Sequence, residues 1–240
     1  MVKYDVFSKI FLYICIQISM DMKKIIFTFI MTVICSTVCG QCRYCTTYED
    51  FMEDRWQQVD TIYCKSHQKS RQVWIGGNDY TLSSDDKAVN KILKKEAFAV
   101  MLDDTLYVNC RNLRYEKTRF GGGYTRARRI GERSLLFVNK MIGREAQNNQ
   151  VVVGFFFGAV GGVISAGNYV KKQVCYIISD GANSKGHIVV RMIDDSLMNQ
   201  MIGTFPDLYK EYYAEGKTSK RILATHVIPI LEKAGLFMGK

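Results

Sequence analysis

The chain contains 240 residues, 48% of them hydrophobic, and it carries a formal net charge of +10. This length accommodates one domain or two small ones with a real hydrophobic core. Only two prolines and the lack of a low-complexity tract argue against a long disordered chain, and the positive charge favours acidic partners or anionic surfaces.

Residues 22–40 have the three parts of a secretory signal peptide. Two lysines precede an apolar run at 25–35, and small residues come before Gln41. Residues 1–21 add an apolar segment that a signal does not need, so we interpret them as a mis-assigned upstream extension; the alternative is an uncleaved membrane anchor. We therefore predict export to the cell envelope, in the periplasm or associated with a membrane.

The mature chain is predicted to begin with a short helix and three strands. Thr47 is expected to cap the helix, and Asp50 three residues later completes a capping box. Runs rich in Val, Ile, Tyr and Trp indicate the strands, at 58–66, 71–77 and 78–84.

A second helix is predicted across residues 85–97, with Ser83 or Ser84 as its N-cap. Its apolar residues follow helical spacing, and two aspartates in its first turn suit the helix dipole. Hairpins are expected at three places: around Asp103 and Asp104, around Gly131 and Glu132, and around a six-residue loop within 173–194.

The C-terminal residues are predicted to be helical in pieces. Asp194 or Asp195 caps the first helix, Pro206 opens the second, and an amphipathic stretch at 219–235 is expected to kink near Pro229.

These elements predict an α+β fold, a mainly antiparallel β-sheet domain with one inserted helix, a glycine-rich apolar helix and a helical C-terminal tail. The expected divisions are the extension (1–21), the signal peptide (22–40), a β-rich α+β domain (41–150), a glycine-zipper apolar segment (151–170), and a β-hairpin with C-terminal helices (171–240).

The segment 151–170 contains no charged residue, and as a helix it would be about 30 Å long, the thickness of a bilayer's hydrocarbon core. Small residues recur there at every fourth position and would form one stripe, namely Gly154, Gly158, Gly162 and Ala166. Such stripes let membrane helices approach closely, so we predict helix packing here and a possible homo-oligomer. Two alternatives are a buried helix packed on the sheet and a pair of glycine-rich strands.

A basic stretch runs from Arg111 to Arg133 and contains eight basic residues interleaved with aromatic ones. Strand alternation places Arg126 and Arg128 on one face and Arg129 on the other. In an exported protein this stretch predicts contact with anionic envelope lipid and not with nucleic acid. The alternative is a solvated face of the sheet.

Two cysteines, Cys42 and Cys45, have the C-x-x-C spacing of redox motifs. A redox pair needs a helix N-terminus that follows a strand, and no strand is expected before Cys42, so a structural disulfide is the preferred interpretation. A zinc site would need a second pair, which the sequence lacks. Ser184 and His187 lie in a loop between strands, where a turn is expected. We predict no catalytic, cofactor-binding or metal-binding residues.

Four motifs resemble a small uncharacterised family of exported proteins from Gram-negative gut bacteria. They are TTYEDF (46–51), GGNDYTL (76–82), DTLYVNCRNLRY (104–115) and RFGGGY (119–124). The resemblance covers most of residues 46–235 and implies a signal peptide and an envelope location. It supplies no activity, and the Cys42 and Cys45 pair lies outside its pattern.

The sequence therefore favours a non-enzymatic binding or structural module of the envelope with a membrane-embedded glycine-zipper segment. The alternative is a soluble periplasmic or secreted ligand-binding domain in which that segment is buried core. An enzyme is the third hypothesis, with no constellation of residues to support it.

Replacing Gly158 with leucine should weaken association of the glycine-zipper helices, because the side chain would hold them apart. Crosslinking of the tagged protein in cells would show less oligomer, while export stays intact. An unchanged crosslinked oligomer would contradict the zipper. Alkaline carbonate extraction separates the two locations of the segment, since an embedded helix stays in the membrane pellet.

Overall fold

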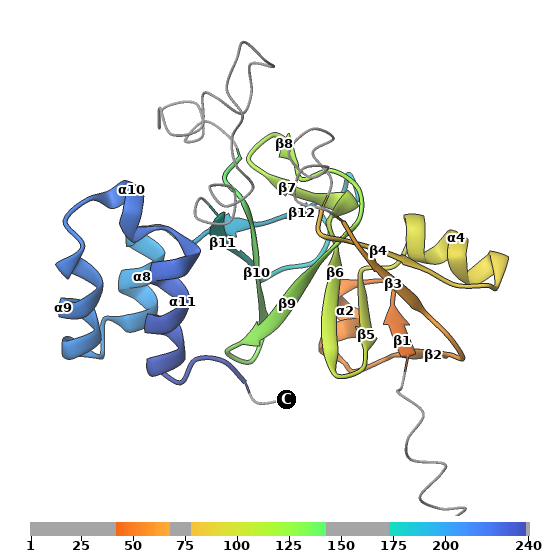
Figure 1. The fold of residues 1–240 in the computed structure, drawn as a ribbon, viewed down its shortest axis with the longest axis horizontal. Helices are drawn as coiled ribbons and strands as arrows, with labels where there is room; N and C mark the ends of the chain where they lie inside the picture. Colours follow the sequence, from red (N-terminus) through yellow and green to blue (C-terminus); the bar gives the residue numbers. More distant parts are fainter. Residues whose placement is uncertain (1–41, 68–77, 143–172, 239–240) are drawn as a thin grey trace, which may run out of the picture. The chain divides into compact units, whose positions relative to one another are not determined.

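An antiparallel sheet assembled from segments far apart in the sequence forms the centre of the fold (Figure 1). The computed structural model describes residues 42–67, 78–142 and 173–238, all within one compact unit that spans residues 41–240. The fold is thus of the mixed α+β type, with a large antiparallel sheet and several helices, as predicted in outline.

The main sheet has the strand order β13-β11-β10-β9-β6-β5-β1-β2, with β4 attached to β9 and β3 to β4. Its strands are β1 (Cys42–Cys45), β2 (Gln57–Val59), β3 (Tyr63–Ser66), β4 (Tyr80–Ser83), β5 (Ala99–Leu102), β6 (Thr105–Asn109), β9 (Tyr124–Ile130), β10 (Ser134–Lys140), β11 (Gln173–Ile178) and β13 (Arg191–Met192). A second, small sheet consists of β12 (Ile188–Val189), β7 (Leu113–Tyr115) and β8 (Thr118–Arg119). A 3-10 turn at Cys110–Asn112 leads from β6 into β7.

Two of the expected hairpins are confirmed. Strands β5 and β6 pair around Asp103 and Asp104, whose φ angles of 46° and 59° fit a tight two-residue hairpin turn. Strands β9 and β10 pair around a turn at 131–133 that begins with Gly131. Local turn chemistry thus accounts for both pairings.

The third expected hairpin, at 173–194, forms only in part. Strand β11 pairs along its whole length with β10, from Leu135 opposite Ile178 to Lys140 opposite Gln173. Its pairing with β13 covers only two residues, because β12 leaves the main sheet and runs parallel to β7 instead. Residues on the two sides of segment 151–170 therefore share one sheet.

The side chains of the strands alternate between the two faces of the sheet and contribute to three apolar clusters. On β10, Leu135 and Phe137 enter the central cluster, whereas Leu136 points to the opposite face and enters the C-terminal cluster. On that same opposite face, Tyr124 of β9 belongs to a third cluster under helix α4. The central cluster also contains Tyr48, Phe51, Phe98, Phe120 and Tyr176; the C-terminal cluster contains Cys175, Ile193, Met198, Tyr212, Val227 and Leu231; the α4 cluster contains Tyr44, Leu82, Leu93, Val100 and Tyr107.

Side-chain caps define where the first helices begin. In α2 (Tyr48–Met52), Thr47 accepts a hydrogen bond from the backbone N–H of Asp50, as expected. In α4 (Lys87–Lys95) the cap is Asp86, not Ser83 or Ser84, since its Oδ1 accepts from Ala88 N at 2.7 Å and Val89 N at 3.2 Å.

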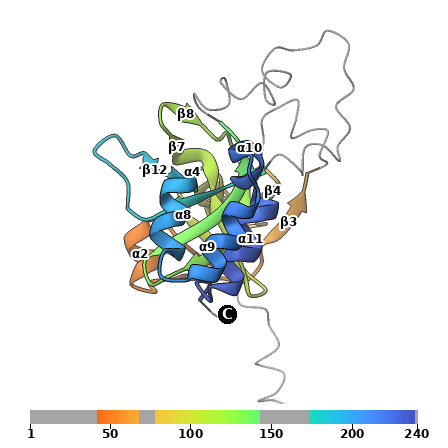
Figure 2. The same ribbon diagram turned by 90° about the vertical axis from the view of Figure 1, so that its left-hand side faces the viewer.

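Four short helices follow the sheet and pack beside one another (Figure 2): α8 (Asp195–Ile202), α9 (Pro206–Ala214), α10 (Thr218–Arg221) and α11 (Ala224–Lys233). Asp194 caps α8, and Pro206 occupies the first turn of α9, both as predicted. The stretch 219–235 is divided at Ile222 and Leu223, because Leu223 adopts an extended conformation and bridges to Val174 of the sheet. Pro229 lies inside α11, beyond that division.

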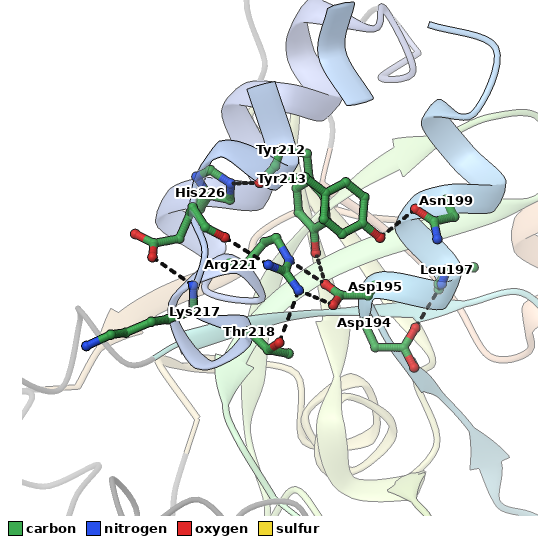
Figure 3. Close-up of polar contacts among 11 residues, drawn as sticks. Asp194, Asp195, Leu197, Asn199, Tyr212, Tyr213, Lys217, Thr218, Arg221 and His226 are labelled. Atoms are coloured by element: carbon green, nitrogen blue, oxygen red, sulfur yellow. Dashed lines mark hydrogen bonds and ion pairs between the residues drawn. The ribbon is translucent and has the colours of Figure 1, made fainter. Parts of the chain in front are cut away.

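One arginine ties these helices together (Figure 3). Arg221, only 7% exposed, donates from Nε to Asp195 Oδ1 at 2.9 Å and from Nη2 to Asp195 Oδ2. Its Nη1 donates to the Glu215 carbonyl at 2.8 Å, and the Tyr212 hydroxyl donates to Asp195 Oδ1 at 2.9 Å. The guanidinium also lies 4.7 Å from the centre of the Tyr213 ring. This clamp joins α8, α9 and α10 at a single carboxylate.

A close backbone contact joins β4 to β9. In the described part of the chain these two strands pair at one position, Tyr80 opposite Tyr124. Next to it, Gly123 has a φ of +98°, and a Cβ on Gly123 would lie 2.9 Å from the Tyr80 carbonyl oxygen. Glycine is therefore required here both for conformation and for space. Buried Asn78 secures the same place by donating to the Gly122 carbonyl and accepting from Asn139 Nδ2 at 2.6 Å.

Some predicted elements lie outside the described residues. These are the extension and signal peptide (1–40), the strand expected at 71–77 and the glycine-rich segment (151–170).

Replacing Gly123 with alanine should destabilise the protein by roughly 2–3 kcal/mol, since the new Cβ meets backbone at a strained φ. Gly122→Ala is the matched control, because a Cβ there would meet nothing within 4 Å, and its effect should stay within about 0.5 kcal/mol. Urea unfolding followed by circular dichroism measures both. Equal losses for the two variants would contradict the close approach of β4 to β9.

Replacing Asp195 with asparagine should cost roughly 1.5–3 kcal/mol of unfolding free energy, because Arg221 keeps its charge without a carboxylate. The hydrogen bond from Arg221 holds the pKa of Asp195 below its ordinary value, with Tyr212 adding to the effect. That stabilisation is complete above the ordinary carboxyl pKa and is lost as the pH falls below it.

Urea unfolding between pH 7 and pH 3 tests the Asp195 clamp. The wild-type protein should lose more stability on acidification than Asp195→Asn does. Glu232→Gln is the matched control, since it changes a half-exposed carboxylate and should cost below about 1 kcal/mol. Parallel pH profiles for wild type and Asp195→Asn would refute the clamp.

Candidate functional site

Strand β9 carries the three arginines that the sequence singled out for an anionic surface. Arg126 and Arg128 are exposed on one face, Ala127 is buried on the other, and Arg129 is half-buried beside it. The predicted alternation is therefore confirmed. The structure brings Arg126 and Arg128 to the same face and separates Arg129 from them.

Two of these arginines contact other elements of the fold. Arg128 forms an ion pair with Glu232 of α11 at 2.6 Å, and its guanidinium lies 3.6 Å from the centre of the Phe237 ring. Arg129 lies 4.5 Å from the centre of the Phe51 ring and donates to the Phe51 carbonyl at 3.2 Å. Both side chains thus connect β9 to neighbouring segments.

Arg126 has a different environment. Its guanidinium lies 5.3 Å from the centre of the Tyr80 ring, and Tyr107 is directly opposite Arg126 on β6. The rings of Tyr80 and Tyr107 meet edge to face at 5.2 Å. Among the described residues, no carboxylate forms an ion pair with Arg126.

The contact of β4 with β9 explains this geometry. Because Gly123 lets the Tyr80 backbone approach, the Tyr80 side chain reaches the face of the sheet that carries Tyr107 and Arg126. An arginine over aromatic rings keeps a fixed direction with less side-chain entropy to lose on binding. We call Arg126, Tyr80 and Tyr107 the Arg126 site.

The protonation states at the Arg126 site suit binding better than proton transfer. Interaction with the Tyr107 hydroxyl raises the pKa of Arg126, so the guanidinium stays charged. Burial raises the pKa of Tyr107 and of Tyr80, so both phenols stay protonated at neutral pH. The exposed Cys64 thiol on β3 adds to the rise in the pKa of Tyr107.

The cysteines of the C-x-x-C motif are not brought together. Cys42 and Cys45 occupy the two ends of β1, and both are buried free thiols. Residues three apart in a strand point to opposite faces, and accordingly Cys42 enters the α4 cluster and Cys45 the central cluster. Burial raises the pKa of Cys45 to about 12, which opposes thiolate chemistry. The expected disulfide is therefore not formed here.

The histidines of the described segments take part in local structure. Both ring nitrogens of His67 are hydrogen-bonded, to the Asn78 carbonyl and to Thr81, and His226 bonds to the Tyr212 carbonyl. His187 lies in the loop that Asn183 organises through its side chain. Within 42–67, 78–142 and 173–238 no group of His, Cys, Asp or Glu could hold a metal ion.

Sequence reasoning missed Tyr80 and Tyr107 as partners of Arg126. Their spacing along the chain carries no signal, because the two tyrosines reach Arg126 from strands that pair with β9 at long range. Only the register between β6 and β9 identifies Tyr107, and only the glycine contact identifies Tyr80.

The residues of the predicted glycine stripe, Gly154, Gly158, Gly162 and Ala166, lie outside the described part of the chain. Of the helices that are described, none has both the length and the apolar character required to cross a membrane.

Comparison with known proteins identifies the family without assigning an activity. No curated protein and no solved structure matches the chain. All the quoted motifs lie within the matched residues, which include the Arg126 site. The model of a family of unknown function, DUF6563, matches residues 43–237, and the chain therefore belongs to that family.

Proposed function

We propose that the protein is a non-enzymatic binding module that holds an anionic group at the Arg126 site. The observation that carries the proposal is an exposed, oriented guanidinium that no carboxylate neutralises among the described residues. Arg128 and Arg129 on the same strand have structural partners. Arg126 therefore differs from the other arginines of this basic strand.

The ligand is expected to combine a negative charge with an apolar or flat portion. A guanidinium donates parallel hydrogen bonds to a carboxylate or phosphate, and the ring of Tyr80 beside it offers an apolar surface. The protonated hydroxyl of Tyr107 supplies a further donor without adding charge. An anionic lipid headgroup with its acyl chains has these properties, and we propose it as the ligand class.

We further propose that the protein acts in the cell envelope after export. The proposal rests on the signal-like residues 22–40 and on the uncharged segment 151–170. If segment 151–170 is embedded in a membrane, it would hold the domain beside lipid. If the segment is buried core instead, binding to lipid would depend on the Arg126 site alone. Homo-oligomerisation through the glycine stripe belongs to the first form.

Replacing Arg126 with glutamine should lower binding to anionic vesicles about tenfold, the change expected from losing one charge-assisted hydrogen bond. Cosedimentation of the protein, from residue 41 on, with vesicles of phosphatidylglycerol and phosphatidylcholine measures this. Arg128→Gln is the matched control, since it removes the same charge from the same face of the same strand.

The Arg128 variant should bind within about twofold of wild type, because Glu232 already neutralises that guanidinium. Equal losses of vesicle binding in both variants would contradict a specific site and would attribute the binding to general surface charge. If the wild-type protein does not bind the vesicles, lipid is refuted as the ligand. Arg126-dependent binding of a soluble aromatic carboxylate would then identify that compound class as the ligand.

A further inference from the structure

A second cationic feature lies on the small sheet, away from the Arg126 site. Arg114 of β7 is only 8% exposed, which is unusual for an arginine without a charged partner. Its Nη1 atom donates to two backbone carbonyls, those of Arg111 and Leu113, both at 2.8 Å. These bonds fix the guanidinium in place through one of its three nitrogens.

The remaining edge of the Arg114 guanidinium makes no hydrogen bond to the described part of the chain. Nε and Nη2 have no hydrogen-bond partner among the described residues, and neither is one of the fully buried atoms that lack a partner. This edge presents two parallel N–H groups, the arrangement that pairs with two oxygens of one oxyanion.

The residue opposite Arg114 carries the same charge. In the β7–β8 hairpin, Arg119 is paired in register with Arg114, and side chains opposite each other in an antiparallel pair share one face about 4.5–5.5 Å apart at Cβ. Like charges at such positions destabilise a hairpin. Burial lowers the pKa of Arg114, and the positive charge of Arg119 lowers it further.

No described carboxylate forms an ion pair with Arg111, Arg114 or Arg119. The short turn of the hairpin, with Glu116 at a φ of 53°, keeps the two facing arginines together. Two positive charges that no described carboxylate pairs match a dianion better than a monoanion, and a phosphate monoester carries a charge of about −1.5 to −2 at neutral pH.

We propose that Arg114 and Arg119 form a phosphate-binding site on the β7–β8 hairpin. Arg114 holds two phosphate oxygens with its Nε and Nη2 edge, and Arg119 closes over the group from the facing strand. The phosphate belongs either to a small soluble phosphate ester or to a lipid headgroup. This site stands independently of the Arg126 site, because the two use different strands and different arginines.

Isothermal titration with inorganic phosphate, at constant ionic strength set with chloride, tests the site in the protein from residue 41 on. Wild type should bind saturably, and Arg119→Gln should lower the affinity about tenfold, the loss of one charge-assisted hydrogen bond. Lys117→Gln is the matched control. It removes one positive charge from the turn of the same hairpin and should stay within about twofold of wild type, since exposed charges are well screened.

Thermal unfolding separates a binding role from a structural one. Without phosphate, Arg119→Gln should unfold no earlier than wild type, because the variant removes a repulsion. Phosphate should raise the unfolding temperature of wild type and of Lys117→Gln more than that of Arg119→Gln. Arg114→Lys keeps the positive charge but lacks the two parallel N–H groups of the guanidinium, so it should lose phosphate binding as well. If that variant does not fold, the Arg119 result still decides.

Titrations with citrate, glycerol phosphate and phosphatidic acid vesicles identify the chemistry of the ligand. Citrate binding as tightly as phosphate would overturn the assignment to phosphate, and failure of wild type to bind inorganic phosphate, glycerol phosphate or phosphatidic acid vesicles would overturn the site. Binding to glycerol phosphate identifies a soluble ester, whereas Arg119-dependent binding only to phosphatidic acid vesicles identifies a lipid headgroup. Arg126→Gln should leave phosphate binding unchanged. The proposal for the Arg126 site and the proposal for the phosphate site can therefore be refuted independently of each other.

Discussion

The fold depends on strand β9, which pairs with β6 on one edge and with β10 on the other. Its side chains enter all three apolar clusters, Tyr124 under α4, Ala127 in the centre and Ile130 beside the C-terminal helices. A strand in this position must satisfy its neighbours on both faces. A shift of one residue in its register would bury arginines in place of Ala127 and expose the apolar residues.

This constraint gives the arginines of β9 different roles. Arg129 shares its face with Ala127 and packs on the Phe51 ring. Arg128 lies near α11 and pairs with Glu232. Arg126 falls between the C-terminal cluster and the α4 cluster, where tyrosines reach it and no described carboxylate does. The position of an arginine along β9 therefore decides its role. Arg128 and Arg129 connect β9 to other elements, whereas Arg126 is available to a ligand.

Local features of the structure were predictable from the sequence, and long-range ones were not. The turns at Asp103 and Gly131 and the caps at Thr47 and Asp194 follow from residues close together in the chain. The parallel pairing of β12 with β7 and the pairing of β10 with β11 join residues that are far apart. The β-propensity of a segment does not specify its partner, because it depends on packing against neighbouring strands. Tertiary packing therefore decides that β11 pairs along its length with β10 and at only two positions with β13.

The same distinction applies to the candidate sites. Composition placed a basic stretch between Arg111 and Arg133, but the pairing register separates its members into buried, paired and free guanidiniums. Arg114 and Arg119 break the rule that opposite charges face each other across a hairpin. Natural sequences are locally consistent except where function demands otherwise. A pair of like charges that face each other across a hairpin therefore carries more information about binding than the net charge of the whole stretch.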